Sequence, residues 1–279
     1  DLKELNSLDI ESFDEKTVGN YIFEKLKENE LKNRDVNFIL SCMPNLLIRE
    51  IIIPIADMDE TYNMVKYESR QFFPVNIDNY VIDFKLIERL EEEGKQRVLV
   101  VALPKTVVEK IINTCKLSGI KLKKIDIEAN VISKIIYSYM MNKGIDAKKP
   151  YAVINIERSF VTSVIAKEGV IEIAKTFPVD FEKLLLKDET LNEDMVYSIN
   201  DIADNVSKFI SFYKSKEHAV INEVYMIGEL ANYEPIRSRI QAETSMNIAE
   251  FNSESFVKFK NDVDKDKLLS ISAAAGGLI

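Results

Sequence analysis

The stretch YAVINIERSFVTSVIAKEGVIEIAKTF, residues 151–177, decides the fold class of this chain. It contains three apolar runs, 151–156, 160–166 and 170–177, which are rich in Val and Ile and are separated by short polar turns. Such runs are typical of short β-strands joined as a meander. We therefore predict that a three-stranded meander opens the second half of the chain.

The segments after this meander alternate between helix and strand. Apolar residues recur at helical spacing over 193–216, namely Ile199, Ile202, Val206, Phe209, Ile210 and Tyr213. They are followed by a strand at 223–227, a helix at 234–242, a weak strand near Ile248 and a helix of small residues at 273–279. This order is typical of a ribonuclease-H-like half of an actin-type fold. We assign 151–279 to that half.

The first part of the chain has the elements of an earlier, incomplete copy. A helix at 14–28 with Asp14 as its cap, a strand at 36–41 and a helix at 129–143 correspond to parts of the second half. We assign 1–45 and 121–150 to this first half. The expected meander does not precede Asp14. Either the chain begins inside the domain, or about 30 further residues precede it. This estimate takes about ten residues for each of the three expected strands with its turn.

Residues 46–120 interrupt the first half and predict a small inserted α+β subdomain. Its expected elements are a strand at 46–53, a helix opened by Asp57 or Asp59, a hairpin of 80–87 and 97–103, and a helix with a Thr106–Glu109 capping box that ends at Gly119. The fold class predicted for the whole chain is α/β, an actin-like, ribonuclease-H-like duplication with this insertion.

Composition excludes several classes of function. The formal net charge of −9 comes from 46 acidic and 37 basic residues that interleave along the chain, which disfavours nucleic acid as a partner. The two cysteines, Cys42 and Cys115, and the one histidine, His218, cannot supply the four ligands of a structural zinc site or a disulfide framework. We expect Cys115 to be a buried core residue and His218 to lie at a solvated helix end. We predict no metal site and a reducing compartment.

Neither a membrane helix nor a signal peptide is expected. The longest apolar runs are far shorter than the ~20 residues that a membrane helix needs, and residues 1–9 are polar and acidic. An amphipathic membrane helix would need basic residues on one face, which 273–279 does not provide. We therefore predict a cytoplasmic protein that reaches the membrane through another protein.

Glycine is scarce, which bears on nucleotide chemistry. The chain has 8 glycines in 279 residues, well below the usual share of ~7%. Phosphate loops use glycine to bring backbone amides close to phosphate, and the chain contains no GxxxxGK[ST], GxGxxG or GxSxG motif. We assign no catalytic residue.

An ordered set of segments resembles the PilM family of type IV pilus assembly proteins. The segment IREIIIPIADMDETYNMVKYESRQFFPVNIDNYVIDFKLI (48–87) has the family's Arg-bearing strand, proline, acidic helix start and aromatic-proline close. VLVVALPKTVVEKIINTCKLSGIKLKKIDIEANVI (98–132) has its Asp-x-Glu-Ala step at Asp126–Ala129. ISFYKS (210–215) and VYMIGELANYEPI (224–236) match later parts. The resemblance covers nearly the whole chain.

The resemblance implies an actin-like fold close to that of the cell-division protein FtsA and a place at the inner face of the cell membrane. It implies that the chain holds the cytoplasmic N-terminal peptide of a PilN-like membrane protein, in a groove between the first subdomain and the insertion. It also implies contact with the pilus motor ATPase. The candidate partner-binding residues are Arg49, Glu68, Phe72, Phe73, Asp126, Glu128 and Asn130.

Two of these candidates also have plainer interpretations. Arg49 lies on an apolar strand and needs a partner, so an ion pair with Glu68 is one account and contact with a peptide backbone is the other. Phe72 and Phe73 precede Pro74 at a helix end, where packing in the core competes with a role as partner anchors.

Members of the family often bind ATP, and the corresponding positions here are altered. The second Asp-x-Gly turn of the superfamily is Asn155-Ile156-Glu157, so a neutral amide and an added carboxylate replace the expected residues. The adenosine turn is Gly228-Glu229. The positions that would face ATP are Asn155, Glu157, Ser159, Gly228 and Glu229. We expect binding of ATP with Mg²⁺ only for a complete chain. The rival functions are an active actin-like ATPase and an FtsA-like protein that polymerises.

Overall fold

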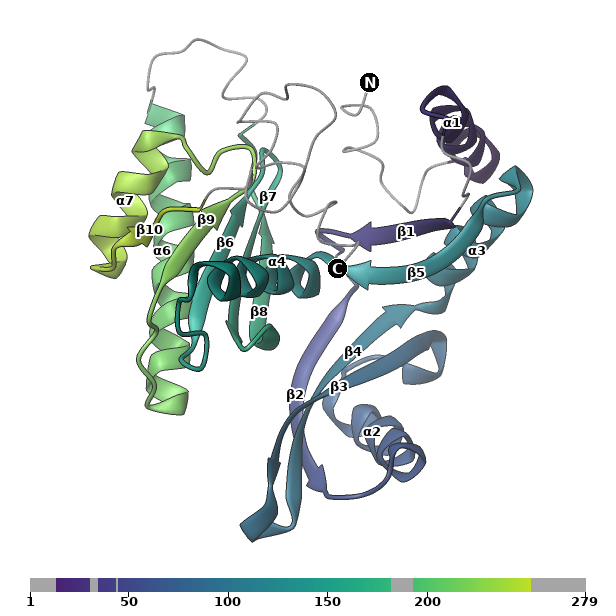
Figure 1. Cartoon of the computed structure of the whole chain (residues 1–279), viewed down its shortest axis with the longest axis horizontal. Coiled ribbons are helices and arrows are strands. Elements are labelled where there is room, and N and C mark those ends of the chain that lie inside the picture. Colours follow the sequence, from purple (N-terminus) through teal and green to yellow (C-terminus); the bar gives the residue numbers. More distant parts are fainter. Residues whose placement is uncertain (1–13, 31–34, 44, 182–192, 252–279) are drawn as a thin grey trace. The chain divides into compact units, whose positions relative to one another are not determined.

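The computed structural model describes residues 14–30, 35–43, 45–181 and 193–251 (Figure 1). The chain divides into two compact units. Unit 1 comprises Asp1–Phe38 and Met43–Ile125, and unit 2 comprises Ile39–Cys42 and Asp126–Ile279. The predicted boundaries at 45/46 and 120/121 both fall inside unit 1, so the separation of an inserted subdomain from the first half stays a prediction.

Unit 1 contains an antiparallel sheet of order β2-β4-β3, built from β2 (Leu47–Pro54), β3 (Tyr80–Leu90) and β4 (Lys95–Pro104). The hairpin expected from the sequence is therefore confirmed, and Gly94 closes it in the left-handed conformation. Helix α2 (Met58–Phe72) packs on one face of the sheet. The core between them consists of Ile51, Ile53, Val65, Phe73, Ile77, Ile82, Val98, Val100 and Ala102.

The start of α2 follows from its capping residue. Asp57, and not Asp59, is the N-cap, and its Oδ1 accepts a hydrogen bond of 2.8 Å from the backbone N–H of Glu60. Later in the helix Thr61, Val65 and Ser69 are buried at a spacing of four residues. A helix with this spacing presents one face to the sheet.

Helices α1 (Glu15–Glu28) and α3 (Lys105–Ser118) cross closely in unit 1. Asp14 caps α1 as predicted, since its Oδ2 accepts a hydrogen bond of 2.7 Å from the backbone N–H of Thr17. The predicted Thr106–Glu109 capping box is wrong, because α3 already begins at Lys105 with Pro104 as its N-cap and without a side-chain cap. Gly119 ends α3 in the left-handed conformation, as expected.

Strands β1 (Asp35–Leu40) and β5 (Lys121–Ile127) pair as a two-stranded sheet. Strand β5 continues directly into α4 (Glu128–Lys143), so the helix begins one residue earlier than predicted and ends at Gly144 as predicted. This direct junction places the carboxylate of Glu128 in the first turn of the helix, where the helix dipole favours negative charge.

Unit 2 contains a five-stranded sheet of order β10-β9-β6-β7-β8. The predicted meander is confirmed as β6 (Tyr151–Ile156), β7 (Phe160–Lys167) and β8 (Val170–Pro178), with antiparallel pairing throughout. Strand β9 (Val224–Ile227) pairs parallel with β6, and β10 (Ile248–Ala249) pairs parallel with β9. The predicted strand near Ile248 is therefore also confirmed.

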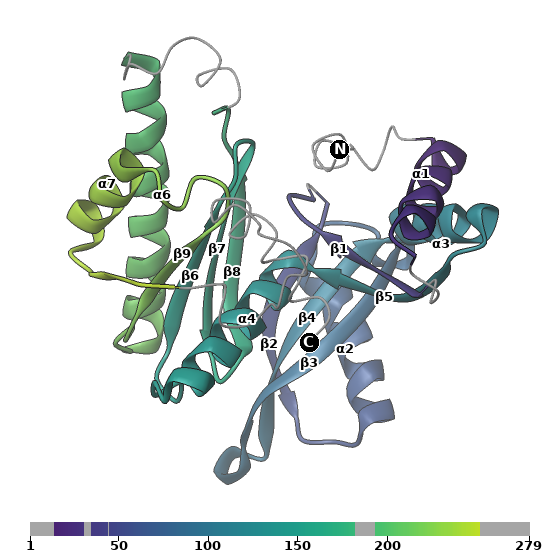
Figure 2. The ribbon, with the colours of Figure 1, turned by 45° about the horizontal axis from the view of Figure 1, so that its top comes forward.

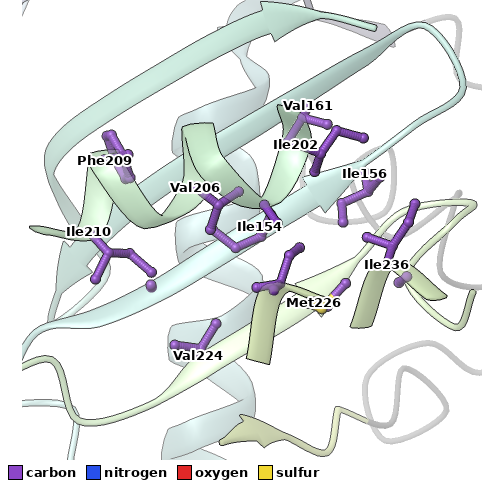
Figure 3. Packing of buried hydrophobic residues seen from close by; sticks show 14 of the residues in the cluster. Ile154, Ile156, Val161, Ile202, Val206, Phe209, Ile210, Val224, Met226 and Ile236 are labelled. Atoms are coloured by element: carbon purple, nitrogen blue, oxygen red, sulfur yellow. The ribbon is translucent and has the colours of Figure 1, made fainter. Parts of the chain in front are cut away.

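Helices cover both faces of this sheet. Helices α6 (Glu193–Glu217) and α7 (Glu234–Thr244) lie on one side and α4 on the other (Figure 2). The side chains of α6 and α7 meet alternate residues of β6 and β9, including Ile154 and Met226 (Figure 3). The intervening residues of β6 face α4, as shown by the hydrogen bond from the Tyr151 hydroxyl to the carbonyl of Ser133 (3.0 Å). Strand alternation therefore turns Asn155 toward the start of α4.

The structure also describes Cys115 and His218, for which the sequence predicted a core position and a helix end. Cys115 is 3% exposed and belongs to the core, as predicted. His218 directly follows the end of α6. The helix expected at 273–279 lies outside the described residues. In the described part of the chain, none of the helices has both the length and the apolar content needed to cross a membrane.

Candidate functional site

The candidate site lies in unit 2, where the parallel strands β6 and β9 end. From β6 the chain continues to β7 on one side, and from β9 it continues to β10 on the other side, so the strand order reverses between β6 and β9 and their carboxyl ends form a switch point. Open α/β sheets bind ligands at such points. The structure brings four of the predicted nucleotide-facing residues together here: Asn155, Glu157, Gly228 and Glu229. Ser159 is exposed in the turn between β6 and β7, where its carbonyl accepts from the N–H of Val179 (2.9 Å).

Gly228 is required by close contact between the two strand ends. Its φ of +97° lies in the region that favours glycine, and an added β-carbon would lie 2.5 Å from the carbonyl oxygen of Ile156. The backbone N–H of Leu230 donates to the same carbonyl at 3.0 Å. The close contact between the strand ends is therefore sufficient to explain why position 228 is a glycine.

Glu128 lies at the centre of a buried polar cluster. Its side chain is 4% exposed and accepts hydrogen bonds from the Ser41 hydroxyl (2.9 Å), the Asn155 amide (3.0 Å) and the Thr162 hydroxyl (2.7 Å). Burial raises the pKa of Glu128, and these three donors partly offset that effect. The position was predicted to bind a partner, and the structure places it inside unit 2.

Glu157 adds a second carboxyl beside this cluster. The backbone N–H of Glu229 donates to its Oε2 at 3.4 Å. Burial, followed by the nearby charge of Glu128, raises the pKa of Glu157 to about 8. The neighbouring Arg158 does not compensate, because its guanidinium is directed to Glu229, with 2.7 Å between Nε and Oε1.

These side chains do not suit a nucleotide polyphosphate. Glu157 holds a carboxyl against the turn amide that a phosphate would need, and Glu128 and Glu229 are further acidic groups at the same strand ends. A phosphate oxygen would have to displace the Glu157 carboxyl from the N–H of Glu229. Within the described ranges, His, Cys, Asp and Glu side chains form no group of three that could hold a metal ion.

The predicted partner-binding residues separate into distinct places. In unit 1, Arg49 donates to the carbonyl oxygen of Phe72 (3.1 Å), and its guanidinium lies 4.5 Å from the centre of the Phe72 ring. Both side chains are exposed. The expected ion pair between Arg49 and Glu68 is wrong, because Arg49 reaches the C-terminal end of α2, where carbonyl groups lack partners within the helix. Phe73 is 8% exposed and is part of the core.

Asp126 and Asn130 form a local structure at the start of α4. Asp126 is 8% exposed, and its Oδ1 accepts from the N–H of Ile127 (2.9 Å) and from the Asn130 amide (2.8 Å). Lys134 lies 4.0 Å from the same carboxylate. These contacts fix the first turn of the helix and with it the position of Glu128.

Sequence reasoning missed Ser41, Thr162 and Arg158. One sequence feature pointed to Thr162, because it is a polar residue within a mainly apolar strand and the register of the meander pairs it with Asn155. Ser41 and Arg158 had no comparable signal, because their partners Glu128 and Glu229 lie far away in sequence.

Comparison with known proteins supports the fold. No family model and no curated protein matches the chain. A solved structure described as "PilM-PilN type IV pilus biogenesis complex" superposes with a TM-score of 0.77 at 16% identity, over 94% of this chain and 84% of that one. A Bacteroides thetaiotaomicron protein with an actin-like ATPase fold gives a TM-score of 0.39 at 8% identity, covering 80% of this chain and 74% of that one.

The cytoplasmic domain of EpsL, an inner-membrane component of the Vibrio cholerae type II secretion system, gives a TM-score of 0.45 at 11% identity, with 92% of this chain and 80% of that one covered. The predicted α/β, actin-like fold class is confirmed.

Proposed function

We propose that this chain is a scaffold of a type IV pilus assembly machine and acts by binding proteins. The observation that carries the proposal is the fold match over 94% of the chain to a structure of PilM in complex with PilN. The ordered PilM-like segments of the sequence add support. In this proposal the chain works in the cytoplasm, at the inner face of the membrane, and is attached there through its partner.

The partner would be the cytoplasmic N-terminal peptide of a PilN-like membrane protein. Such a peptide binds in extended form, with its backbone hydrogen bonds setting the register and its apolar side chains giving affinity. The exposed Arg49–Phe72 pair of unit 1 suits this task. Arg49 offers five N–H donors, and the described residues engage one of its nitrogens in a single hydrogen bond. A peptide carbonyl or carboxylate could use the others, beside the Phe72 ring.

The proposal includes no ATP hydrolysis. The Glu157 carboxyl accepts from the N–H of Glu229 and so occupies the turn amide that a polyphosphate would need. A contact with the pilus motor ATPase is a further part of the proposal and rests on the family resemblance. An active ATPase or a polymerising FtsA-like protein would be favoured instead by nucleotide turnover or by sedimenting filaments.

The test is direct binding of a synthetic peptide that carries the cytoplasmic N-terminus of a PilN-like protein from the same genome. Saturable binding is expected in fluorescence anisotropy. Phe72→Ala and Arg49→Ala should each weaken binding by about tenfold or more, as expected for aromatic and arginine anchors. Phe212→Ala is the matched control, since Phe212 is an exposed aromatic of unit 2. Absence of binding by the wild-type chain would remove the proposal.

A further inference from the structure

The outer edge of β3 is a candidate interaction surface of unit 1. In the sheet order β2-β4-β3, strand β3 pairs only with β4 among the described residues. The backbone N–H of Phe84 donates to Oδ1 of Asp83 at 2.8 Å, so this N–H points away from β4. Alternation along the strand directs the backbone groups of Ile82 and Leu86 to the same outer edge. Such a row of N–H and C=O groups can accept another strand.

Asp83 and Lys85 place opposite charges on either side of Phe84. A second copy of β3 can lie antiparallel to the first with the two Phe84 residues opposite each other. Asp83 of each copy then lies opposite Lys85 of the other, at two symmetric places. Opposite charges in directly facing positions stabilise an antiparallel pair, and like charges destabilise it. The charge pattern of this edge is therefore complementary to itself.

Hydrogen bonding restricts the other possible registers. Outward backbone groups must meet outward backbone groups, so one copy can move along the other only in steps of two residues. A step in either direction centres the pairing on Asp83 or on Lys85, and equal charges then face each other. The Phe84-centred register also sets Ile82 opposite Leu86, whose side chain is 40% exposed. Both lie in the regular part of β3, since the shift in its pairing with β4 comes after Leu86.

We propose that two copies of this chain form a symmetric dimer by antiparallel pairing of their β3 strands, centred on Phe84. The N–H of Phe84 then leaves Asp83 and donates to the Phe84 carbonyl of the other copy, and Asp83 turns to Lys85 of that copy. The two three-stranded sheets become one continuous sheet, through the same surface on both chains. An interface of this kind is small, so the dimer should be weak. The inference uses only the β3 edge and does not depend on the proposed peptide partner.

Sedimentation velocity of the whole chain tests the proposal. The mean mass of the wild-type chain should rise from one chain toward two as its concentration increases from about 10 μM to about 1 mM, the range expected for a small transient interface. Amide exchange measured by NMR locates the contact. The Phe84 amide should exchange more slowly at the higher concentration, while the amide of Val100, in the central strand, stays unchanged. A single-chain mass throughout, or a Phe84 amide that ignores concentration, would overturn the proposal. A peptide that binds this edge of a chain that stays monomeric would do the same.

Charge variants distinguish this register from any other dimer. Asp83→Lys and Lys85→Asp each bring equal charges together at both symmetric places, so each should weaken the dimer by about tenfold. The double variant Asp83→Lys/Lys85→Asp should restore wild-type dimerisation, because opposite charges face each other again. Glu92→Lys, in the turn between β3 and β4, is the control for net charge and should dimerise as the wild type does. Dimers that respond equally to all of these changes would refute pairing through β3.

Discussion

The Asn155 side chain and Gly228 are in such close contact that no larger residue fits at position 228. A β-carbon added to Gly228 would lie 2.5 Å from Oδ1 of Asn155. This contact joins the ends of β6 and β9 and fixes the Asn155 amide, which donates to Glu128 at 3.0 Å.

Replacement of Gly228 should therefore be costly. Gly228→Ala combines a strained φ with a clash against backbone atoms of Ile156, and we expect a loss of about 2–4 kcal/mol in the free energy of unfolding. Urea denaturation measures it. Gly94→Ala is the control, since Gly94 also has a positive φ but has no atom within 4 Å of an added β-carbon. Equal losses for the two variants would show that the contact with β6 has no energetic weight.

Glu157 should make stability depend on pH. Its pKa is raised to about 8 in the folded chain against an ordinary value of 4.5, so the unfolded chain releases this proton first. The wild-type chain should therefore lose stability as the pH rises from about 4.5 to about 8, by at most roughly 1.4 kcal/mol per pH unit from this group. Glu157→Gln should flatten that part of the profile and be more stable than wild type at pH 8. Denaturant titrations at several pH values test both statements.

Cys42 should report the charge of Glu128. That charge contributes to the raised pKa of the Cys42 thiol, so Glu128→Gln should lower it. The measurement is the pH dependence of alkylation in a Cys115→Ala background, which leaves a single thiol. Asp126→Asn, which changes a neighbouring carboxylate, should leave the thiol pKa nearly unchanged. An unaltered profile in Glu128→Gln would mean that burial alone raises the pKa.

The crossing of α1 and α3 should be sensitive at Gly19. A β-carbon there would lie 1.8 Å from the Ser118 hydroxyl oxygen and 2.7 Å from the carbonyl oxygen of Thr114. Gly19→Ala should destabilise the chain by about 1–3 kcal/mol, because overpacking forces the two helices apart. Ser118→Ala should restore part of the loss by removing the nearer atom. Thermal unfolding of the two single variants and the double variant measures this coupling.

Part of the candidate site could be predicted from the sequence. Asn155, Glu157, Gly228 and Glu229 were placed at one site because the resemblance maps them onto the second Asp-x-Gly turn and the adenosine turn of the actin superfamily. The charge partners were not predictable to the same degree. Arg49 was expected to contact Glu68 and instead contacts Phe72, a choice that depends on where α2 ends against β2.

The sequence by itself determined the order and ends of most elements, since Asp14, Asp57, Gly119 and Gly144 act on the backbone within a few residues of themselves. Tertiary structure decided the electrostatics. Glu128 collects donors that lie 87, 27 and 34 residues away along the chain. The pKa of Glu128 and of Glu157 depends on how deeply packing buries them and how near it brings them. Burial and distance arise when separate segments pack together, so local sequence patterns do not encode them.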